Sequence, residues 1–143
     1  MSEPVWIDER EALAIHDQLL ALDGGASGVR DTGLLQSALA RPRQLHSYGE
    51  NPDVVDMAAA YISGIIRNHP FIDGNKRTGF LVGILFLELN GPRFTASEES
   101  AAQAILNLAA GTLDDPALVS WLRGNVTLSA FASNNPSADV QPF

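Results

Sequence analysis

The residues best suited to chemistry lie in one run, His69-Pro-Phe-Ile-Asp-Gly-Asn-Lys-Arg77, which joins two strongly apolar segments. A histidine can take a proton from an attacking hydroxyl near neutral pH. The carboxylate of Asp73 is a hard oxygen ligand of the kind that Mg²⁺ prefers. Polar residues between core helices lie near the core and need partners or a ligand. The run therefore predicts a site for phosphate chemistry.

The second half of this run should form an anion site. Gly74 permits a sharp turn or the close approach of a ligand, and Asn75 is expected to cap the helix that follows. A helix N-terminus favours anions, so two cations at this end, Lys76 and Arg77, are mildly unfavourable unless a polyphosphate binds there. Phe71 is expected to anchor the loop to the core.

Each part of the run also has a simpler interpretation. A histidine near an aspartate often makes only a structural hydrogen bond, a Lys-Arg pair is usually solvated, and Gly-Asn is usually a turn. The spacing His-x-x-x-Asp also fits two metal ligands one helical turn apart, but Pro70 and Gly74 argue against a continuous helix. Only the ordered combination favours a catalytic site.

Six helices are predicted to position this run, from apolar residues at helical spacing and from capping residues. Their expected bounds are Asp8 to about Leu22, Asp31 to Ala40, Asp53 to about Asn68, Asn75 to Leu89, Ser97 to Ala110, and Asp115 to Trp121. Alternation with period two is nearly absent. The pattern predicts an all-α fold, a single compact bundle of about six helices.

The segment between the second and third helices is expected to be a loop. Arg41-Pro42 should close the second helix, because the residue before a proline disfavours helical geometry. Within residues 43–52, His46 and Tyr48 are candidate contacts for a target peptide, although a solvated loop with one packed tyrosine is an equal alternative. His16, on the first helix, is interpreted as a packed or surface histidine rather than a ligand.

Length and composition narrow the class of protein. A chain of 143 residues fits one domain. Residues 1–127 are expected to form it, and residues 128–143, rich in Ser, Asn, Ala and Pro, a flexible tail. A net charge of −8 opposes direct nucleic-acid binding. The absence of cysteine excludes thiolate chemistry, and the lack of a signal sequence or a long apolar run predicts a cytoplasmic protein without membrane contact.

The run His69 to Arg77 resembles the signature of the Fic/Doc superfamily, His-x-Phe-x-Asp/Glu-Gly-Asn-Gly/Lys-Arg, at all nine positions. Residues 28–42 and 86–91 are similar to the death-on-curing (Doc) branch, and the resemblance extends from Trp6 to Val126. It implies the small six-helix Doc core and a toxin that is neutralised by a cognate antitoxin protein.

The resemblance also implies a role for each matching residue. His69 matches the catalytic histidine, Phe71 the loop anchor, and Asp73 the carboxylate that holds Mg²⁺ on the nucleotide phosphates. Gly74 and Asn75 match the anion nest, and Lys76-Arg77 matches the phosphate-binding basic pair.

Two departures from the wider family bear on the reaction. Members that transfer AMP usually have glycine where Lys76 stands and a second arginine where Phe80 stands. Doc-type members share both departures and resemble kinases, which transfer the terminal phosphate of ATP to a Ser or Thr hydroxyl, in the archetype a threonine of elongation factor Tu.

The sequence keeps two alternatives open, AMP transfer to a protein hydroxyl and a non-catalytic nucleotide- or partner-binding module. No good copy of the family's inhibitory motif is found, and this favours inhibition by a separate antitoxin.

Overall fold

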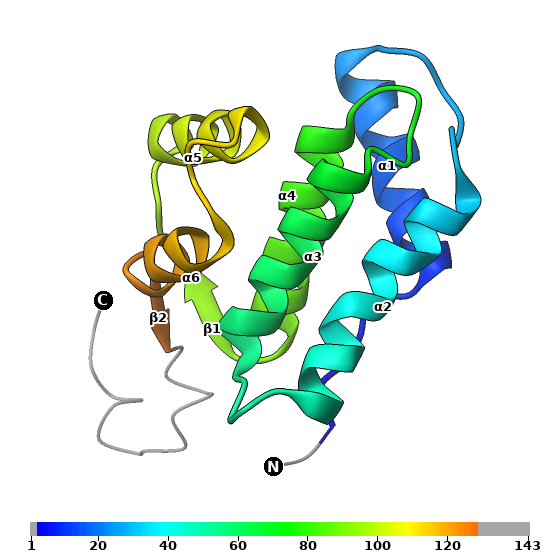
Figure 1. Ribbon diagram of the computed structural model, residues 1–143. Coiled ribbons are helices and arrows are strands. Elements are labelled where there is room, and N and C mark those ends of the chain that lie inside the picture. The colour runs from blue at the N-terminus through cyan, green and yellow to red at the C-terminus, as the bar shows by residue number, and fades with distance from the viewer. Residues whose placement is uncertain (1–2, 129–143) are drawn as a thin grey trace.

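Six helices and one small sheet make up the part of the chain that the structure describes (Figure 1). This structure is a computed structural model, and it describes residues 3–128. In chain order the elements are α1 (Glu9–Asp23), α2 (Thr32–Tyr48), α3 (Val54–Asn68), α4 (Asn75–Leu89), β1 (Pro92–Phe94), α5 (Glu98–Ala110), α6 (Asp115–Arg123) and β2 (Val126–Leu128). The prediction of an all-α fold with about six helices is confirmed.

Helix α3 forms the centre of the core, packed most extensively against α4 and α2. Its segment from Tyr61 to Ile66 is buried throughout. Two glycines of α4 allow the close approach: a Cβ atom on Gly79 would lie 3.0 Å from Cγ1 of Ile66, and one on Gly83 would overlap Ile62. This contact fixes the end of α3 against the beginning of α4, where the polar run lies.

The predicted caps of four helices are confirmed. In each case a side-chain oxygen accepts a hydrogen bond from the backbone N–H three residues later, which satisfies one of the free donors of the first turn. The caps are Asp8, Asp31, Asp53 and Ser97. Asp8 with Glu11, and Asp53 with Asp56, form reciprocal capping boxes.

The predicted end of the second helix is wrong. Helix α2 continues through Pro42 to Tyr48, so the expected loop of residues 43–52 is mostly helix. Pro42 and Leu39 are buried, and the Cα of Ala38 would lie 3.4 Å from a Cβ atom on Gly64 of α3. We attribute the continued helix to this packing against α3, which offsets the backbone hydrogen bond that the proline lacks.

The predicted start of the sixth helix is displaced by one residue, and its end by two. Asp114, not Asp115, is the N-cap, and α6 ends at Arg123. The side chain of Asp115 instead accepts a 2.7 Å hydrogen bond from the Ser63 hydroxyl and lies 3.2 Å from Arg67, both on α3. The side chain of Asp115 therefore makes tertiary contacts with α3, and Asp114 caps the helix.

A short antiparallel sheet was not predicted. Strands β1 and β2 pair with Arg93 opposite Thr127, and three residues are too few to show an alternating pattern. Leu128, placed at the start of the expected tail, is the last residue of β2. The rest of that tail, residues 129–143, lies outside the described residues.

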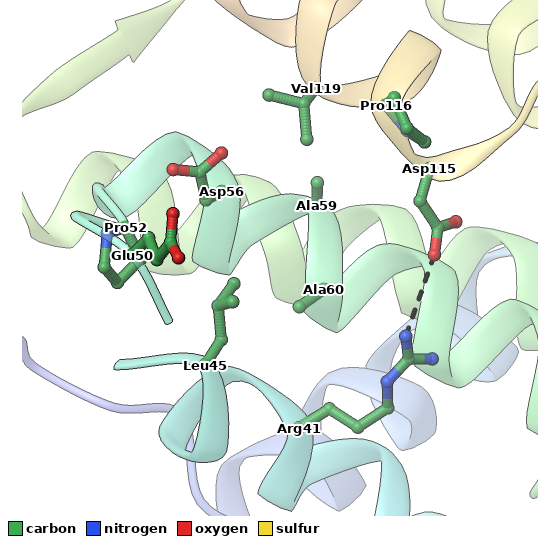
Figure 2. Close-up of a pocket in the computed structure, with 10 residues that line it drawn as sticks. All are labelled: Arg41, Leu45, Glu50, Pro52, Asp56, Ala59, Ala60, Asp115, Pro116 and Val119. Carbon is green, nitrogen blue, oxygen red and sulfur yellow. Dashed lines mark ion pairs between the residues drawn. The ribbon is translucent and has the colours of Figure 1, made fainter. Parts of the chain in front are cut away.

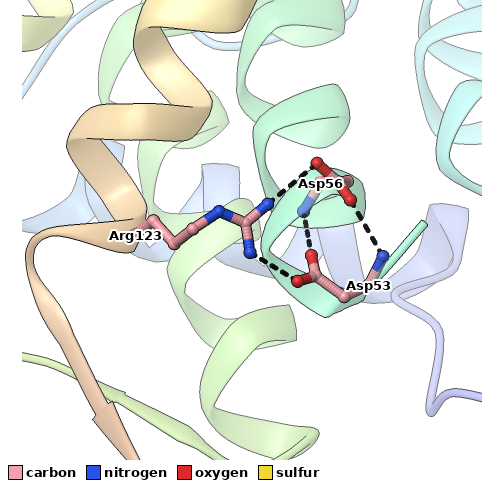
Figure 3. Close-up of polar contacts among 3 residues, drawn as sticks. All are labelled: Asp53, Asp56 and Arg123. Atoms are coloured by element: carbon pink, nitrogen blue, oxygen red, sulfur yellow. Dashed lines mark hydrogen bonds and ion pairs between the residues drawn. The ribbon is translucent and has the colours of Figure 1, made fainter. Parts of the chain in front are cut away.

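Helix α6 is joined to the beginning of α3 by one arginine (Figure 3). Arg123 donates to Asp53 and, at 3.2 Å, to Asp56, the two residues of the capping box. Burial raises the pKa of Asp53, but the hydrogen bonds from Arg123 and from the Asp56 backbone outweigh it, so the pKa lies below its usual value. Among the helices of residues 3–128, none has both the length and the hydrophobicity to cross a membrane.

Candidate active site

His69, the histidine predicted to accept a proton, lies at the end of α3. His69 is the C-cap of this helix and has left-handed backbone angles, φ 53° and ψ 53°. Its backbone N–H donates to the carbonyl of Ile65, while its side chain is exposed. Glycine usually takes this conformation at helix ends, so a histidine here carries conformational strain.

The loop that follows is fastened to the core by a side-chain amide. Asn75 is only 4% exposed; its amide accepts from the backbone N–H of Phe71 at 2.8 Å and donates to the carbonyl of the same residue at 2.9 Å. Asn75 is therefore not the helix cap that was predicted, since Gly74 takes that position without a side-chain cap bond. The ring of Phe71 is fully buried, so this residue packs in the core.

A second segment, residues 28–31, holds the other side of the loop. Val29 pairs with Phe71 in an isolated antiparallel bridge, and the backbone N–H of Arg30 donates to the Pro70 carbonyl at 2.7 Å. The Arg30 guanidinium also donates to the carbonyl of His69 at 2.7 Å and to that of Asn68 at 2.9 Å. Arg30 was not predicted as a site residue, because nothing in its local pattern links it to a helix end 38 residues away.

The carboxylate of Asp73 is exposed and held by backbone donors. Oδ1 accepts from the N–H of Gly74 at 2.8 Å, and Oδ2 accepts from the N–H of Ala26 at 3.3 Å. These two bonds, assisted by the charge of Arg77, hold the pKa of Asp73 below its usual value. The group is therefore a carboxylate at neutral pH and keeps lone pairs free for another ligand.

Two cations lie at the beginning of α4. Lys76 and Arg77 are both exposed, and Nη1 of Arg77 lies 3.0 Å from a carboxylate oxygen of Asp23 at the end of α1. The first backbone N–H groups of a helix have no acceptor within the helix, and at α4 no side chain caps them. The free backbone N–H groups and the two cationic side chains therefore lie at the same end of α4.

These groups line one cavity of about 330 Å³. Its lining consists of His69, Asp73, Gly74, Asn75, Lys76 and Arg77. The structure therefore brings together a possible proton acceptor, a carboxylate and an anion-binding helix end, all from the predicted run.

The site fits a divalent cation only as part of a larger ligand. Within residues 3–128, no group of three or more His, Asp or Glu side chains is arranged to hold a metal ion. Mg²⁺ commonly binds through one or two carboxylates together with substrate phosphates and water. Asp73 beside an anion site meets that requirement.

His46 and Tyr48 are not part of this cavity. Both lie in the last turn of α2, next to the beginning of α3, whereas His69 ends α3 (Figure 1). Helix α3 has 15 residues, so about 20 Å separates the two ends. The ring of His46 contacts Trp6 edge-on, and Tyr48 is 87% exposed.

Two larger cavities differ from this site in their lining. One of about 520 Å³ lies between α2, α3 and α6 (Figure 2), where Arg41 pairs with Asp115 at 3.7 Å. Three of its charged residues, Arg41, Asp56 and Asp115, already form ion pairs, and its lining contains no histidine. The other, about 390 Å³, shares Lys76 and Arg77 with the site and continues along Phe80 and the apolar face of α5.

Comparison with known proteins matches the same region. Residues 6–87, which include α1 to α4 almost completely, match the model of the Fic/DOC family. The chain is 41% identical over 87 residues to "Toxin Doc" of Mycolicibacterium smegmatis, covering 59% of this chain and 66%, just under two thirds, of that protein. It is 31% identical over 117 residues to "Protein kinase doc" of Escherichia phage P1, covering 82% of this chain and 92% of that protein.

Proposed function

Because the chain belongs to the Fic/Doc family and to its Doc branch, we propose that it is a toxin that transfers the terminal phosphate of ATP to a Ser or Thr hydroxyl of a target protein. The observation that carries the proposal is the single cavity lined by His69, Asp73, Lys76 and Arg77. One relative is named a toxin and the other a protein kinase, which supports both halves of the proposal.

The donor phosphates bind at the beginning of α4. The free backbone N–H groups, the helix dipole and the two cations Lys76 and Arg77 all favour a polyphosphate there. Mg²⁺ held by Asp73 would neutralise phosphate charge as the reaction proceeds. Binding of the anion also offsets the repulsion between two cations and the positive helix end.

His69 then acts as the general base. It takes the proton from the target hydroxyl, whose oxygen forms a bond to the terminal phosphorus. The bond from that phosphorus to the bridging oxygen breaks, and ADP leaves with the bonding electron pair. General-base assistance typically contributes about 10²–10⁴-fold, so His69→Ala should reduce the rate by at least that factor.

Phe80 favours phosphate transfer over AMP transfer. In the structure its ring packs against Phe94, with centroids 5.6 Å apart, and it lines the groove beside Lys76 and Arg77. The position therefore adds an apolar wall and no third cation. A triphosphate held by one pair of cations has less support for presenting its α-phosphate to the target.

The target and the inhibitor follow from family membership alone. We expect the target to be a translation factor such as elongation factor Tu, whose modification would arrest growth, and the inhibitor to be a separate antitoxin protein. Figure 1 shows α5 beside the beginning of α4, so a protein bound across these helices would cover the site.

The test uses ATP labelled either at the γ-phosphate or on the adenosine, with Mg²⁺, in a translation extract. The proteins compared are the wild type, His69→Ala, and His46→Ala as a matched histidine change about 20 Å from the site. Label from the γ-phosphate alone, on one protein and dependent on His69 but not on His46, would support the kinase and identify its target.

The other outcomes decide between the alternatives. Adenosine label on a protein would establish AMP transfer. Nucleotide binding without label of either kind would favour a binding module. Loss of transfer in His46→Ala would restore the end of α2 as a candidate docking surface for the target.

A further inference from the structure

A buried histidine of α1 lies directly beneath the loop that carries Asp73. His16 is 2% exposed. Its Nε2 lies 2.7 Å from the backbone carbonyl oxygen of Asp73, and its ring stacks on that of Phe71, with centroids 3.9 Å apart and planes 10° apart. Family resemblance assigned no role to this residue, and the packing interpretation explains the stacking but not the hydrogen bond.

The direction of this hydrogen bond is fixed by its partner. A carbonyl oxygen can only accept, so Nε2 of His16 must carry the hydrogen. The stacked Phe71 ring, itself fully buried, prevents the imidazole from turning away. The donor is therefore aimed at one backbone atom, the carbonyl that leads from Asp73 to Gly74.

The turn at Gly74 lies against the same imidazole. Gly74 has φ +79°, and a Cβ atom there would lie 3.6 Å from Nε2 of His16. On the other side, the Asp73 carboxylate accepts from the Ala26 N–H, in the residues just after α1. Helix α1 and the segment that follows it thus contact both the main chain and the side chain of Asp73.

We propose that His16 is a positioning residue that sets the orientation of the Asp73 carboxylate for a metal-bound nucleotide. By holding the Asp73 carbonyl, His16 fixes the peptide plane between Asp73 and Gly74, whose N–H donates to Oδ1 of Asp73. The direction of the carboxylate follows from that plane. The inference rests on the proposed function, since it assumes that Asp73 is the metal ligand.

A pair of substitutions separates hydrogen bonding from simple occupancy of the core. In His16→Gln, the amide nitrogen reaches about the position of Nε2 and can donate to the Asp73 carbonyl. In His16→Asn, the shorter amide stops near the position of Nδ1 and does not reach it. Both variants bury a neutral amide, so a role in packing alone predicts similar behaviour.

Two readouts are made on the full-length chain. The first is binding of a fluorescent ATP analogue with and without Mg²⁺, because changes to groups that orient metal ligands typically cost about 10–100-fold in metal affinity. We expect His16→Asn to raise the Mg²⁺ concentration for half-maximal binding by about ten-fold. Metal-free binding, which depends on Lys76 and Arg77, should change little, and His16→Gln should remain near the wild type.

The second readout is amide hydrogen exchange of residues 71–77 without nucleotide. It should accelerate in His16→Asn and not in His16→Gln, with thermal unfolding measured to show that both variants are folded. If the two variants behave alike in both readouts, the positioning role is wrong. If wild-type binding ignores Mg²⁺, the proposed function is wrong, while the exchange data still decide whether His16 orders the loop.

Discussion

Arg30 donates hydrogen bonds to two consecutive backbone carbonyls, that of Asn68 and that of His69. Its guanidinium donates to the carbonyl of Asn68 at 2.9 Å and to that of His69 at 2.7 Å. A cation at the C-terminus of α3 also complements the helix dipole. The strained backbone of the histidine is therefore held by an arginine from outside the run His69 to Arg77.

The first prediction concerns this arginine. Arg30→Ala should lower kcat for phosphate transfer by about ten-fold or more, because small displacements of a catalytic group are costly. The KM for ATP should change little, since the anion site is untouched. Steady-state kinetics measure both. Arg10→Ala, an exposed arginine of α1, is the control, and a rise in KM with unchanged kcat would contradict the assignment.

The left-handed conformation of His69 predicts a difference between two inactive variants. His69→Gly removes the strain at φ 53°, whereas His69→Ala retains it. The glycine variant should be more stable by about 1 kcal/mol. Urea unfolding measures the difference, and equal stabilities would show that the backbone at this position is unstrained.

Asp23 should compete with phosphate for Arg77. The two side chains are 3.0 Å apart and each is more than 40% exposed, and exposed pairs contribute about 0–1 kcal/mol. Asp23→Asn should therefore tighten ATP binding by up to about five-fold. Asp17→Asn, on the same helix, is the charge-matched control. Weaker ATP binding in Asp23→Asn would show that Asp23 positions Arg77 instead of restraining it.

Neighbouring glycines after α1 provide a test of the Asp73 carboxylate. Both have positive φ, but a Cβ atom on Gly25 would lie 2.8 Å from Oδ2 of Asp73, whereas one on Gly24 would contact nothing within 4 Å. Gly25→Ala should raise the Mg²⁺ requirement of transfer by about ten-fold. Gly24→Ala, with similar backbone strain, should not, and a shared effect would point to strain alone.

The ion pair in Figure 3 predicts how stability depends on pH. The pKa of Asp53 is lowered in the fold, so the folded protein binds fewer protons than the unfolded chain in acid. The resulting stabilisation is complete above the unfolded pKa of about 4 and is lost as the pH falls through the lower folded value.

Arg123→Gln should therefore weaken the loss of stability between pH 7 and about pH 3. Urea midpoints at the two pH values measure the effect, with Arg93→Gln, an exposed arginine of β1, as the control. If both variants show the wild-type acid dependence, Arg123 does not lower the pKa of Asp53.

Local patterns predicted most of the helices but failed where distant residues decide the outcome. Helix α4 ends at Leu89 as expected, where Asn90 follows its apolar segment, although Gly74 and not Asn75 is its N-cap. Pro42 predicts the end of a helix, yet the helix continues past it where it packs on α3. Asp115 is predicted as a cap from its local sequence, yet Ser63 and Arg67 bind its side chain.

The same division holds at the site. The residues that line the cavity all lie within one run of nine residues, His69 to Arg77, so their order alone indicated the chemistry. Arg30 and His16 act on backbone carbonyls, and such contacts leave no pattern in the sequence. For His16 there was one usable signal, its position four residues after Ala12 on the buried face of α1, where a polar side chain needs a partner.

The contiguity of the cavity-lining run, His69 to Arg77, has a consequence for how such a protein can diversify. The reacting groups, and the residues that hold them, all fall within the span 6–87 that matches the family. Helices α5 and α6 and the β1–β2 ribbon lie beyond it. Evolution can therefore replace this C-terminal segment, and change the proteins that it contacts, without changing the residues that carry out the reaction.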